Sequence, residues 1–231
     1  MTVNTILFDL DNTLCEYNRS PSDLLSESFA RLGIDPFFDE AEYINRYEEF
    51  LDDADSMEEL RKMCFSSIAE SKGRDPGVGY ELADIYNELR DYRNVRYTPG
   101  AEQILERVTN THQVGILTNG DPEMQWPKIN ALGLDEYYDE LVFAGHSVPA
   151  KPDPDPFHHI LSNLDSTPDQ AVHIGDNLDT DIAGAKSVGC HAVWVEDPSI
   201  ATPSPRPDYS ISQLNEFPTI LERLRDENPT L

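Results

Sequence analysis

The sequence predicts an α/β protein in three layers, a parallel sheet with helices on both faces, into which an all-helical domain is inserted after the first strand. Two observations lead to this fold class. From about residue 98 onward, short apolar stretches alternate with helical ones, which is typical of parallel strands joined by helices. Between residues 20 and 96 the strand signal disappears and one helix-start signal follows another. We therefore expect a core formed by residues 1–16 and 96–231 and a helical domain formed by residues 17–95.

The first strand is the apolar stretch Thr5–Phe8, which leads directly into the pentapeptide Asp9–Thr13. Residues two apart in an extended chain face the same side, so Asp9 and Asp11 are expected to face one site. Two adjacent carboxylates repel each other unless one is protonated or a cation lies between them, and Mg²⁺ prefers such oxygen ligands. Alternatively, both aspartates are solvated and cap the following helix. The residues that follow the other strands decide between these interpretations.

The helical domain is predicted from its helix ends. Ser20 and Pro21 are typical of a helix N-terminus, and Gly33 is a suitable stop for that first helix. Ser56 and Glu59 form a capping-box pattern that opens another helix. The expected helices are about 21–32, 39–51, 57–72 and 76–92.

The core elements follow from the change of pattern after residue 96. Apolar stretches of four to five residues predict buried strands, and the longer stretches between them predict helices. The expected strands are 113–117, 141–144, 170–174, 191–195 and an edge strand at 209–211. The expected helices are about 101–110, 122–132, 154–164, 180–188 and a closing helix that ends near residue 225.

Acidic residues dominate the composition. The chain has 17 basic and 44 acidic residues, a formal net charge of −27 and a pI near 4.3. Nucleic acid is excluded as a partner because its binding requires a basic surface. The N-terminus has no signal-peptide pattern, no stretch is apolar enough for a membrane span, and the three cysteines are far apart, so we expect a cytoplasmic protein. Because salt screens the repulsion between like charges, the acidity also suggests a halophilic origin.

Polar residues follow three further strands of the predicted sheet. Thr118 and Asn119 end the second strand, Lys151 follows the third, and Asp176 and Asp181 follow the fourth. Taken singly, each has an ordinary structural explanation, such as a helix cap, a solvated charge or an acidic helix start. The carboxyl ends of parallel strands lie at one edge of the sheet, where ligands bind in such folds. Together, these residues indicate a functional site at that edge.

The ordered set of motifs resembles the haloacid dehalogenase superfamily of aspartate-nucleophile hydrolases. The resemblance rests on Asp9-x-Asp11-x-Thr13, on Thr118, on Lys151 before a proline, and on the stretch 175–181, Gly-Asp-Asn-Leu-Asp-Thr-Asp. It covers most of the core, and the helical insertion resembles the family's cap domain. The resemblance implies a Rossmann-like core with strand order 5-4-1-2-3, a cap at residues 17–95, a Mg²⁺ cofactor and, in most members, phosphomonoester hydrolysis.

The resemblance also implies roles at the first motif. Asp9 is expected to be the nucleophile that forms an aspartyl-phosphate. Asp11 is expected to be the general acid and base, and also a metal ligand through its backbone carbonyl. Thr13 is expected to orient the loop through hydrogen bonds.

Downstream, Thr118, Asn119 and Lys151 are the expected phosphate-binding residues, with Lys151 as a fixed positive charge. Asp176 is expected to bind the metal together with Asp9. Asp181 is expected to be the second acid of that motif and a further metal residue, which binds either directly or through water. The spacing favours Asp181 and leaves Asp179 as its rival.

The predicted function is therefore Mg²⁺-dependent hydrolysis of a small phosphorylated metabolite. A phosphomutase or a 2-haloacid dehalogenase would use the same scaffold, although Asp11 argues against the dehalogenase, whose pattern lacks that acid. A non-catalytic binding or regulatory protein is the alternative of another class. The sequence predicts neither the substrate nor the oligomeric state. Arg19, Arg61 and Lys62 of the helical domain are candidate anion contacts, but a solvated or ion-paired position is the stronger expectation for each.

Overall fold

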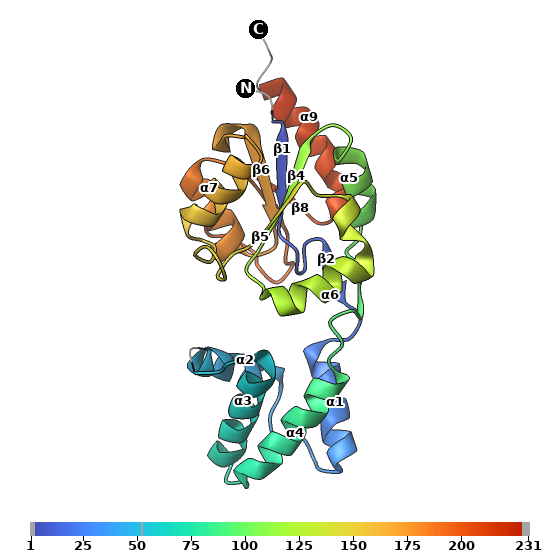
Figure 1. The fold of residues 1–231 in the computed structure, drawn as a ribbon, viewed down its shortest axis with the longest axis vertical. Coiled ribbons are helices and arrows are strands. Elements are labelled where there is room, and N and C mark those ends of the chain that lie inside the picture. Colours follow the sequence, from blue (N-terminus) through green and yellow to red (C-terminus); the bar gives the residue numbers. More distant parts are fainter. Residues whose placement is uncertain (1–2, 52, 228–231) are drawn as a thin grey trace. The chain divides into compact units, whose positions relative to one another are not determined.

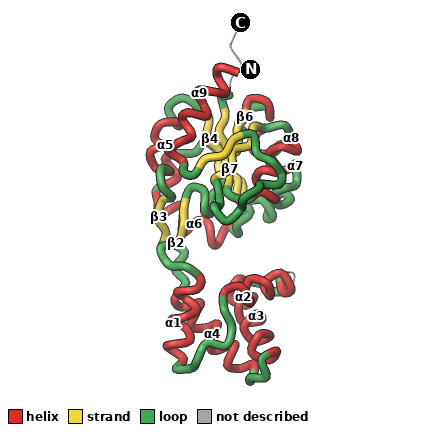
Figure 2. The backbone as a smooth tube through the Cα atoms, turned by 180° about the vertical axis from the view of Figure 1, so that it is seen from behind, coloured by secondary structure: helices red, strands yellow, loops and turns green. Residues whose placement is uncertain are grey.

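The computed structural model describes residues 3–51 and 53–227, which fold into two compact units. One unit combines the chain up to Tyr17 with the chain from Tyr92 onward, and the other is Asn18–Asp91. The first unit contains the sheet and the second is helical (Figures 1 and 2). Each unit has its own hydrophobic core, and each is described separately below.

A six-stranded sheet forms the centre of the first unit, and all of its strand pairs are parallel. Its order is β5-β4-β1-β6-β7-β8, so β1 lies in the middle and β8 at an edge, which confirms the predicted fold class and strand order. The strands are β1 (Thr5–Phe8), β4 (Gln113–Thr118), β5 (Glu140–Phe143), β6 (Ala171–Gly175), β7 (His191–Val195) and β8 (Tyr209–Ile211).

Helices cover both faces of this sheet because successive strand residues point to opposite sides. Ile6 and Phe8 pack into a cluster with residues of α5 (Ala101–Val108) and α9 (Phe217–Glu227). Leu7 packs into a cluster with residues of α7 (Pro154–Asn163) and α8 (Ala183–Val188). Figure 1 shows α5 and α9 on one side of the sheet and α7 on the other. The helices of this unit are α5 (Ala101–Val108), α6 (Pro122–Leu132), α7 (Pro154–Asn163), α8 (Ala183–Val188) and α9 (Phe217–Glu227).

The helix predicted at 180–188 begins differently in the structure. A π-helical turn, Leu178–Ile182, precedes α8. Asn177 starts this turn, since its side-chain oxygen accepts hydrogen bonds from the backbone N–H groups of Asp179 and Thr180. The wider turn brings Asp181 to the buried side of the chain, where its side chain is 2% exposed.

A second, two-stranded sheet lies next to the first motif and was not predicted. It pairs β2 (Cys15–Tyr17) with β3 (Val95–Tyr97) in antiparallel fashion. Each strand has only three residues, too few for an alternating pattern to be recognised. These strands are the segments through which the chain leaves and re-enters the first unit.

The helical unit contains α1 (Pro21–Leu32), α2 (Glu40–Tyr47) with a 3₁₀ turn at Glu48–Phe50, α3 (Met57–Ser71) and α4 (Pro76–Leu89). Ser20 caps α1 through a complete capping box with Asp23, as its sequence predicts. The interior is rich in aromatic side chains in edge-to-face contact, including Phe29, Phe38 and Phe65. This interior explains why consecutive helices without strands form a stable unit.

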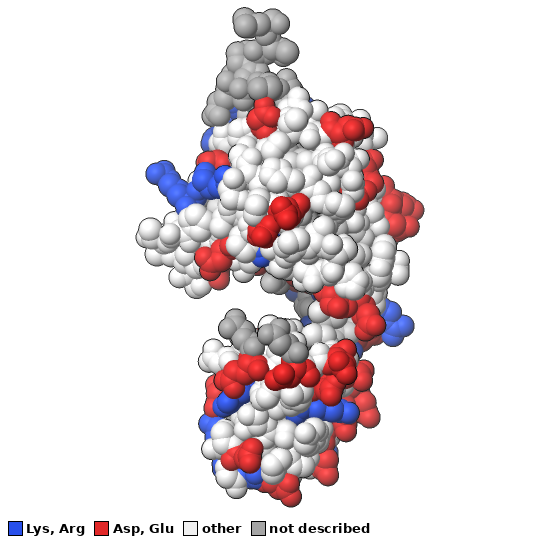
Figure 3. All heavy atoms as spheres, turned by 60° about the vertical axis from the view of Figure 1, so that its left-hand side comes forward, with Lys and Arg blue, Asp and Glu red and all other residues white. Residues whose placement is uncertain are grey.

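Acidic side chains are spread over the visible surfaces of both units and outnumber basic ones there (Figure 3). None of the helices within residues 3–51 and 53–227 has both the length and the hydropathy needed to cross a bilayer.

Candidate active site

Lys151 lies at the centre of the polar residues at the carboxyl edge of the sheet. Its Nζ donates to Asp9 Oδ1 at 2.7 Å, to Asp181 Oδ1 at 2.6 Å and to the carbonyl of Leu117 at 2.6 Å. An ammonium group has three hydrogens, so each finds an acceptor. The Lys151 side chain is only 1% exposed, follows β5, and joins Asp9 after β1, the Leu117 carbonyl inside β4 and Asp181 after β6. The structure thus brings together Asp9, Lys151 and Asp181, the sequence-predicted residues that follow β1, β5 and β6.

Three carboxylates form a group that fits a divalent cation. One oxygen each from Asp9, Asp176 and Asp181 lies within 4.8 Å of the others. Lys151 offsets one of their three negative charges, so the group has an excess of negative charge and of the oxygen ligands that Mg²⁺ prefers. The exposed Asp179, the rival candidate, is not part of this group.

The surroundings shift the pKa values of these carboxyl groups apart. Burial raises the pKa of Asp9 well above its usual range. Burial, together with the negative charge of Asp181, raises the pKa of Asp176 to about 6. Burial acts in the same direction on Asp181, but Lys151 and His173 outweigh it and hold its pKa below the usual range. Both raised pKa values reflect carboxylates that are buried beside other negative charges, and a cation among them would stabilise their ionised forms.

His173 supports Asp181 from inside the sheet and was missed by the sequence analysis. Its Nε2 lies 3.0 Å from Asp181 Oδ1, and its ring packs edge-on against Phe157. The residue is fully buried, and this burial lowers its pKa, which favours the neutral ring. A histidine inside an otherwise apolar strand was the available signal.

Gly175 provides the space that Asp181 occupies. A Cβ on Gly175 would lie 2.3 Å from Asp181 Cγ, far closer than packed atoms approach. Behind the same loop, the buried Trp194 donates from its indole nitrogen to the carbonyl of Asp176 at 2.8 Å. This hydrogen bond holds the backbone of the loop that carries Asp176.

Asp11 points to a different set of partners from Asp9. Lys128 Nζ donates to Asp11 Oδ1 at 2.5 Å, and Gln125 Nε2 donates to Asp11 Oδ2 at 2.7 Å. The side chain of Asp11 is therefore not one of the three grouped carboxylates. Lys128 also lies over the ring of Tyr17, 4.8 Å from its centre. Burial acts to lower the pKa of Lys128, but Asp11 and Tyr17 together outweigh it and raise that pKa.

Thr118 and Asn119 have distinct positions. The Thr118 hydroxyl is buried at the end of β4 and accepts hydrogen bonds from the Gly120 N–H at 3.1 Å and from Gln125 Nε2 at 2.9 Å. Asn119, predicted as a phosphate ligand, uses its amide to bind the backbone of Lys151 through both its oxygen and its nitrogen. Asn119 therefore fixes the loop that carries Lys151.

Thr13 differs from its expected role. Its hydroxyl is buried and finds no hydrogen-bond partner among the described residues. The loop is held instead through the backbone, because the Thr98 hydroxyl donates to the Thr13 carbonyl. Asn12 adopts φ 58°, a left-handed conformation that asparagine tolerates better than most residues, and so turns the chain after Asp11.

The candidate cations of the helical unit are engaged within that unit. Arg19 forms an ion pair with Glu27 at 2.6 Å, and Lys62 forms one with Asp84 at 2.7 Å. Arg61 is buried rather than solvated, and its guanidinium donates to the side chain of Asn87 at 2.8 Å.

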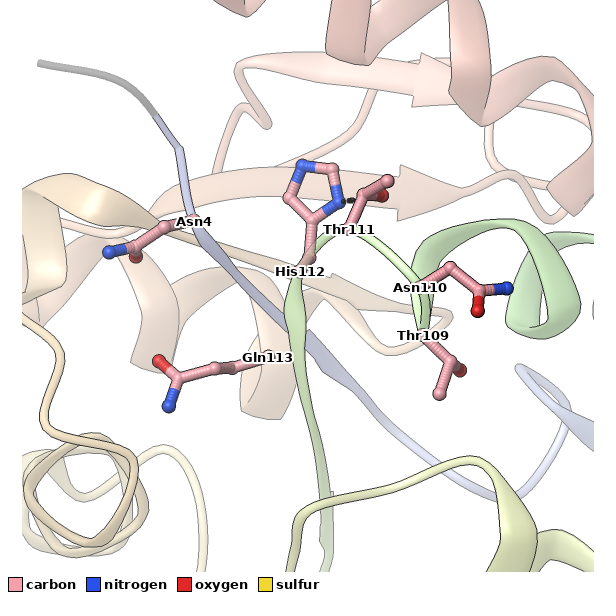
Figure 4. A pocket seen from close by; sticks show the side chains of 6 residues that line it. All are labelled: Asn4, Thr109, Asn110, Thr111, His112 and Gln113. Carbon is pink, nitrogen blue, oxygen red and sulfur yellow. Dashed lines mark hydrogen bonds between the residues drawn. The ribbon is translucent and has the colours of Figure 1, made fainter.

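A surface hollow of about 330 Å³ lies at the opposite edge of the sheet, where β1 and β4 begin (Figure 4). It is lined by Asn4 and by residues 109–113, and the Thr111 hydroxyl contacts His112 Nδ1 at 2.8 Å. Its lining has neither acidic nor lysine or arginine side chains. The carboxylates and Lys151 follow the other ends of the strands, so this hollow is separate from the candidate active site.

Known proteins are similar to this chain over most of its length. Residues 3–189 match the family of haloacid dehalogenase-like hydrolases. The glyceraldehyde 3-phosphate phosphatase of Pyrococcus furiosus is 29% identical, with 98% of this chain and 95% of the relative covered. The ribulose-1,5-bisphosphate 5-phosphatase of Halopiger xanaduensis is 30% identical, with 92% and 96% covered. The crystal structure of the hydrolase YfnB from Bacillus subtilis, bound to magnesium, has a TM-score of 0.75 and 21% identity, with 96% of this chain and all of that chain covered.

Proposed function

Since the chain belongs to the haloacid dehalogenase-like hydrolases, we propose that it hydrolyses the phosphate monoester of a small metabolite through an aspartyl-phosphate. One observation carries the proposal. Asp9 is held at 2.7 Å by the buried Lys151, beside two further carboxylates within 4.8 Å, at the carboxyl edge of the sheet. This combination provides a nucleophile, a positive charge and the oxygen ligands of a cation in one place.

In the first step, a carboxylate oxygen of Asp9 attacks the phosphorus atom, and the bond from phosphorus to the ester oxygen breaks. Asp11 gives a proton to the leaving oxygen, so that a neutral alcohol departs. The ammonium charge of Lys151 and the hydroxyl of Thr118 stabilise the negative charge on the phosphoryl oxygens.

In the second step, a water molecule attacks the phosphorus atom of the aspartyl-phosphate. Asp11, now ionised, takes a proton from this water, and the bond between phosphorus and the Asp9 oxygen breaks. Inorganic phosphate leaves and both carboxyl groups return to their starting states. One residue therefore serves as acid and then as base.

Mg²⁺ is the cofactor that this site would take. Asp9, Asp176 and Asp181 would hold it, with the Asp11 carbonyl as a further oxygen ligand, and their oxygen-only donor set supports this choice. When bound, Mg²⁺ offsets the charge of the carboxylates and of the phosphoryl group.

The relatives narrow the substrate class. The names of the Pyrococcus and Halopiger relatives both describe removal of a phosphate from a small sugar. We therefore expect this chain to act on a phosphorylated sugar or a metabolite of similar size. A mutase would instead return an isomerised phosphate ester, and a dehalogenase would release halide from a 2-haloacid.

A phosphate-release screen tests the proposal. The panel contains glyceraldehyde 3-phosphate, ribulose 1,5-bisphosphate, other sugar phosphates, phosphoserine and a 2-haloacid, with Mg²⁺ and with molar KCl as a parallel condition. Asp9→Asn, nearly identical in shape, is the matched control, and we expect it to lack activity. Release of phosphate by Asp9→Asn at the wild-type rate, or halide release without phosphate release, would refute the proposal.

A further inference from the structure

Helix α6 carries two side chains, Gln125 and Lys128, that lie about one helical turn apart and both reach Asp11. Gln125 donates to one carboxylate oxygen of Asp11 and Lys128 to the other, at 2.7 and 2.5 Å. With a separate donor on each oxygen, both the position and the rotation of the carboxylate are fixed.

Gln125 and Lys128 are buried, although the carboxylate to which they donate is partly exposed. Gln125 is fully buried and Lys128 is 2% exposed, whereas the Asp11 side chain remains 38% exposed. Removing an ammonium or an amide from water costs free energy. A half-exposed carboxylate is already stabilised by water and needs no buried partners for folding. The free-energy cost of burying Gln125 and Lys128 is explained if the function of these two residues is to orient Asp11.

Gln125 also acts on Thr118. Its Nε2 donates to the Thr118 hydroxyl at 2.9 Å, and the Gly120 N–H donates to the same oxygen at 3.1 Å. A hydroxyl has two lone pairs and one hydrogen, so both lone pairs are occupied and the hydrogen is left to be donated. Gly120 leaves room for this contact, because a Cβ there would lie 1.7 Å from Gln125 Nε2.

We infer that Gln125 and Lys128 are positioning residues, which hold Asp11 where it exchanges a proton with the ester oxygen. Gln125 in addition turns the Thr118 hydroxyl into a donor toward the phosphoryl group. This inference rests on the proposed function. Each Asp11 oxygen keeps a second lone pair, so the transferred proton has a place without loss of either hydrogen bond.

Activity toward two phosphate esters of similar size distinguishes the delivery of a proton to the leaving group from the binding of the phosphoryl group. Phenyl phosphate releases a basic phenolate that needs a proton, whereas 4-nitrophenyl phosphate releases a weakly basic nitrophenolate that hardly does. The value of kcat/KM reports the step in which the ester bond breaks. The ratio of the two values, measured on one sample, does not depend on how much of that sample is folded.

Lys128→Met is expected to lower kcat/KM about tenfold or more for phenyl phosphate and less than about threefold for 4-nitrophenyl phosphate. Lys128→Arg, which keeps the cation and the donor, restores part of the loss. Gln125→Met, a shape-matched change, lowers both values, because the Thr118 hydroxyl serves the phosphoryl group of both esters. The loss with phenyl phosphate is again the larger one.

Lys186→Met is the control, since Lys186 forms an ion pair with Asp208 at 2.6 Å outside the site, and its ratio should equal that of the wild type. Equal losses on both esters in the Lys128 and Gln125 variants, or no loss in either, would overturn the inference while the proposed function stands. Absence of any phosphate release by the wild-type chain would overturn the proposed function, and this inference with it.

Discussion

The side-chain amide of Asn119 is hydrogen-bonded to both backbone polar groups of Lys151. Asn119 Nδ2 donates to the Lys151 carbonyl at 2.9 Å, and the Lys151 N–H donates to Asn119 Oδ1 at 2.8 Å. The loop after β5 is thereby tied to the end of β4, and the Lys151 side chain starts from a fixed point. The position of the lysine charge therefore depends on a residue of another strand.

Replacing Asn119 by Ala should lower kcat/KM by about tenfold to a hundredfold, because small displacements of a charged group in an active site have effects of that size. The two lost hydrogen bonds should also reduce the free energy of unfolding by about 2 kcal/mol. Steady-state kinetics and urea denaturation measure the two effects. Asn163→Ala, which removes an exposed contact with Glu140, is the control. Unchanged kinetics in Asn119→Ala would contradict the positioning role.

Replacing Lys151 by Met should destabilise the metal-free protein by about 3–5 kcal/mol, since Asp9 and Asp181 would remain buried without their shared cation. Urea denaturation in the presence of a chelator measures this loss. Lys186→Met removes an ion pair of similar length whose lysine side chain is 38% exposed, and should cost less than about 1 kcal/mol. Similar losses in both variants would show that the Lys151 network does not stabilise the fold.

Replacing Asp181 by Asn should weaken Mg²⁺ binding about tenfold or more, whereas Asp179→Asn should leave it nearly unchanged. The reason is that Asp181 belongs to the three grouped carboxylates and Asp179 is exposed outside them. The rise of the melting temperature with Mg²⁺ concentration measures the affinity of each variant. The reverse order of effects would assign the metal to Asp179.

Mg²⁺ affinity should fall as the pH decreases through about 6, the raised pKa of Asp176, because the cation must displace the proton bound there. In the metal-free protein, the effect of pH on folding stability has the opposite sign to its effect on Mg²⁺ affinity. The folded chain holds this proton more tightly than the unfolded chain, so its contribution to stability decreases as the pH rises from 3.8 toward about 6. Calorimetric titration at about pH 5 and about pH 7.5 measures the affinity change. Asp176→Asn should remove the inflection near pH 6, and its persistence would assign the effect to another group.

The melting temperature should rise between about 0.1 and about 1 M KCl, as the Debye length falls from about 10 to about 3 Å. The reason is the net charge of −27, whose self-repulsion disfavours the compact state. NaCl and KCl should act alike, because screening depends on ionic strength alone. A melting temperature that does not change with salt would count against halophilic adaptation.

Apolar patterns predicted the parallel sheet because its strands are short apolar runs, and polar or charged residues lie in the segments that follow four of them. The sequence alone therefore predicted that Asp9, Thr118, Lys151 and Asp176 lie at the same edge of the sheet. Gln125 and Lys128 were not found, because polar residues on a helix are usually solvated, and only the packing of α6 shows that these two are buried. Asn119 was read as a ligand for a similar reason, since backbone contacts between distant loops leave no periodic signal.

The β2–β3 pair holds together the two points at which the chain enters and leaves the helical unit. Because Tyr17 pairs with Val95, the segment that enters the helical unit runs beside the segment that leaves it. In topological terms, the whole helical unit is the loop that connects the two strands of a short hairpin. The order of the strands in the six-stranded sheet does not depend on the length of this loop. The chain thus leaves and re-enters the first unit at adjacent points, and the helical unit does not interrupt the six parallel strands.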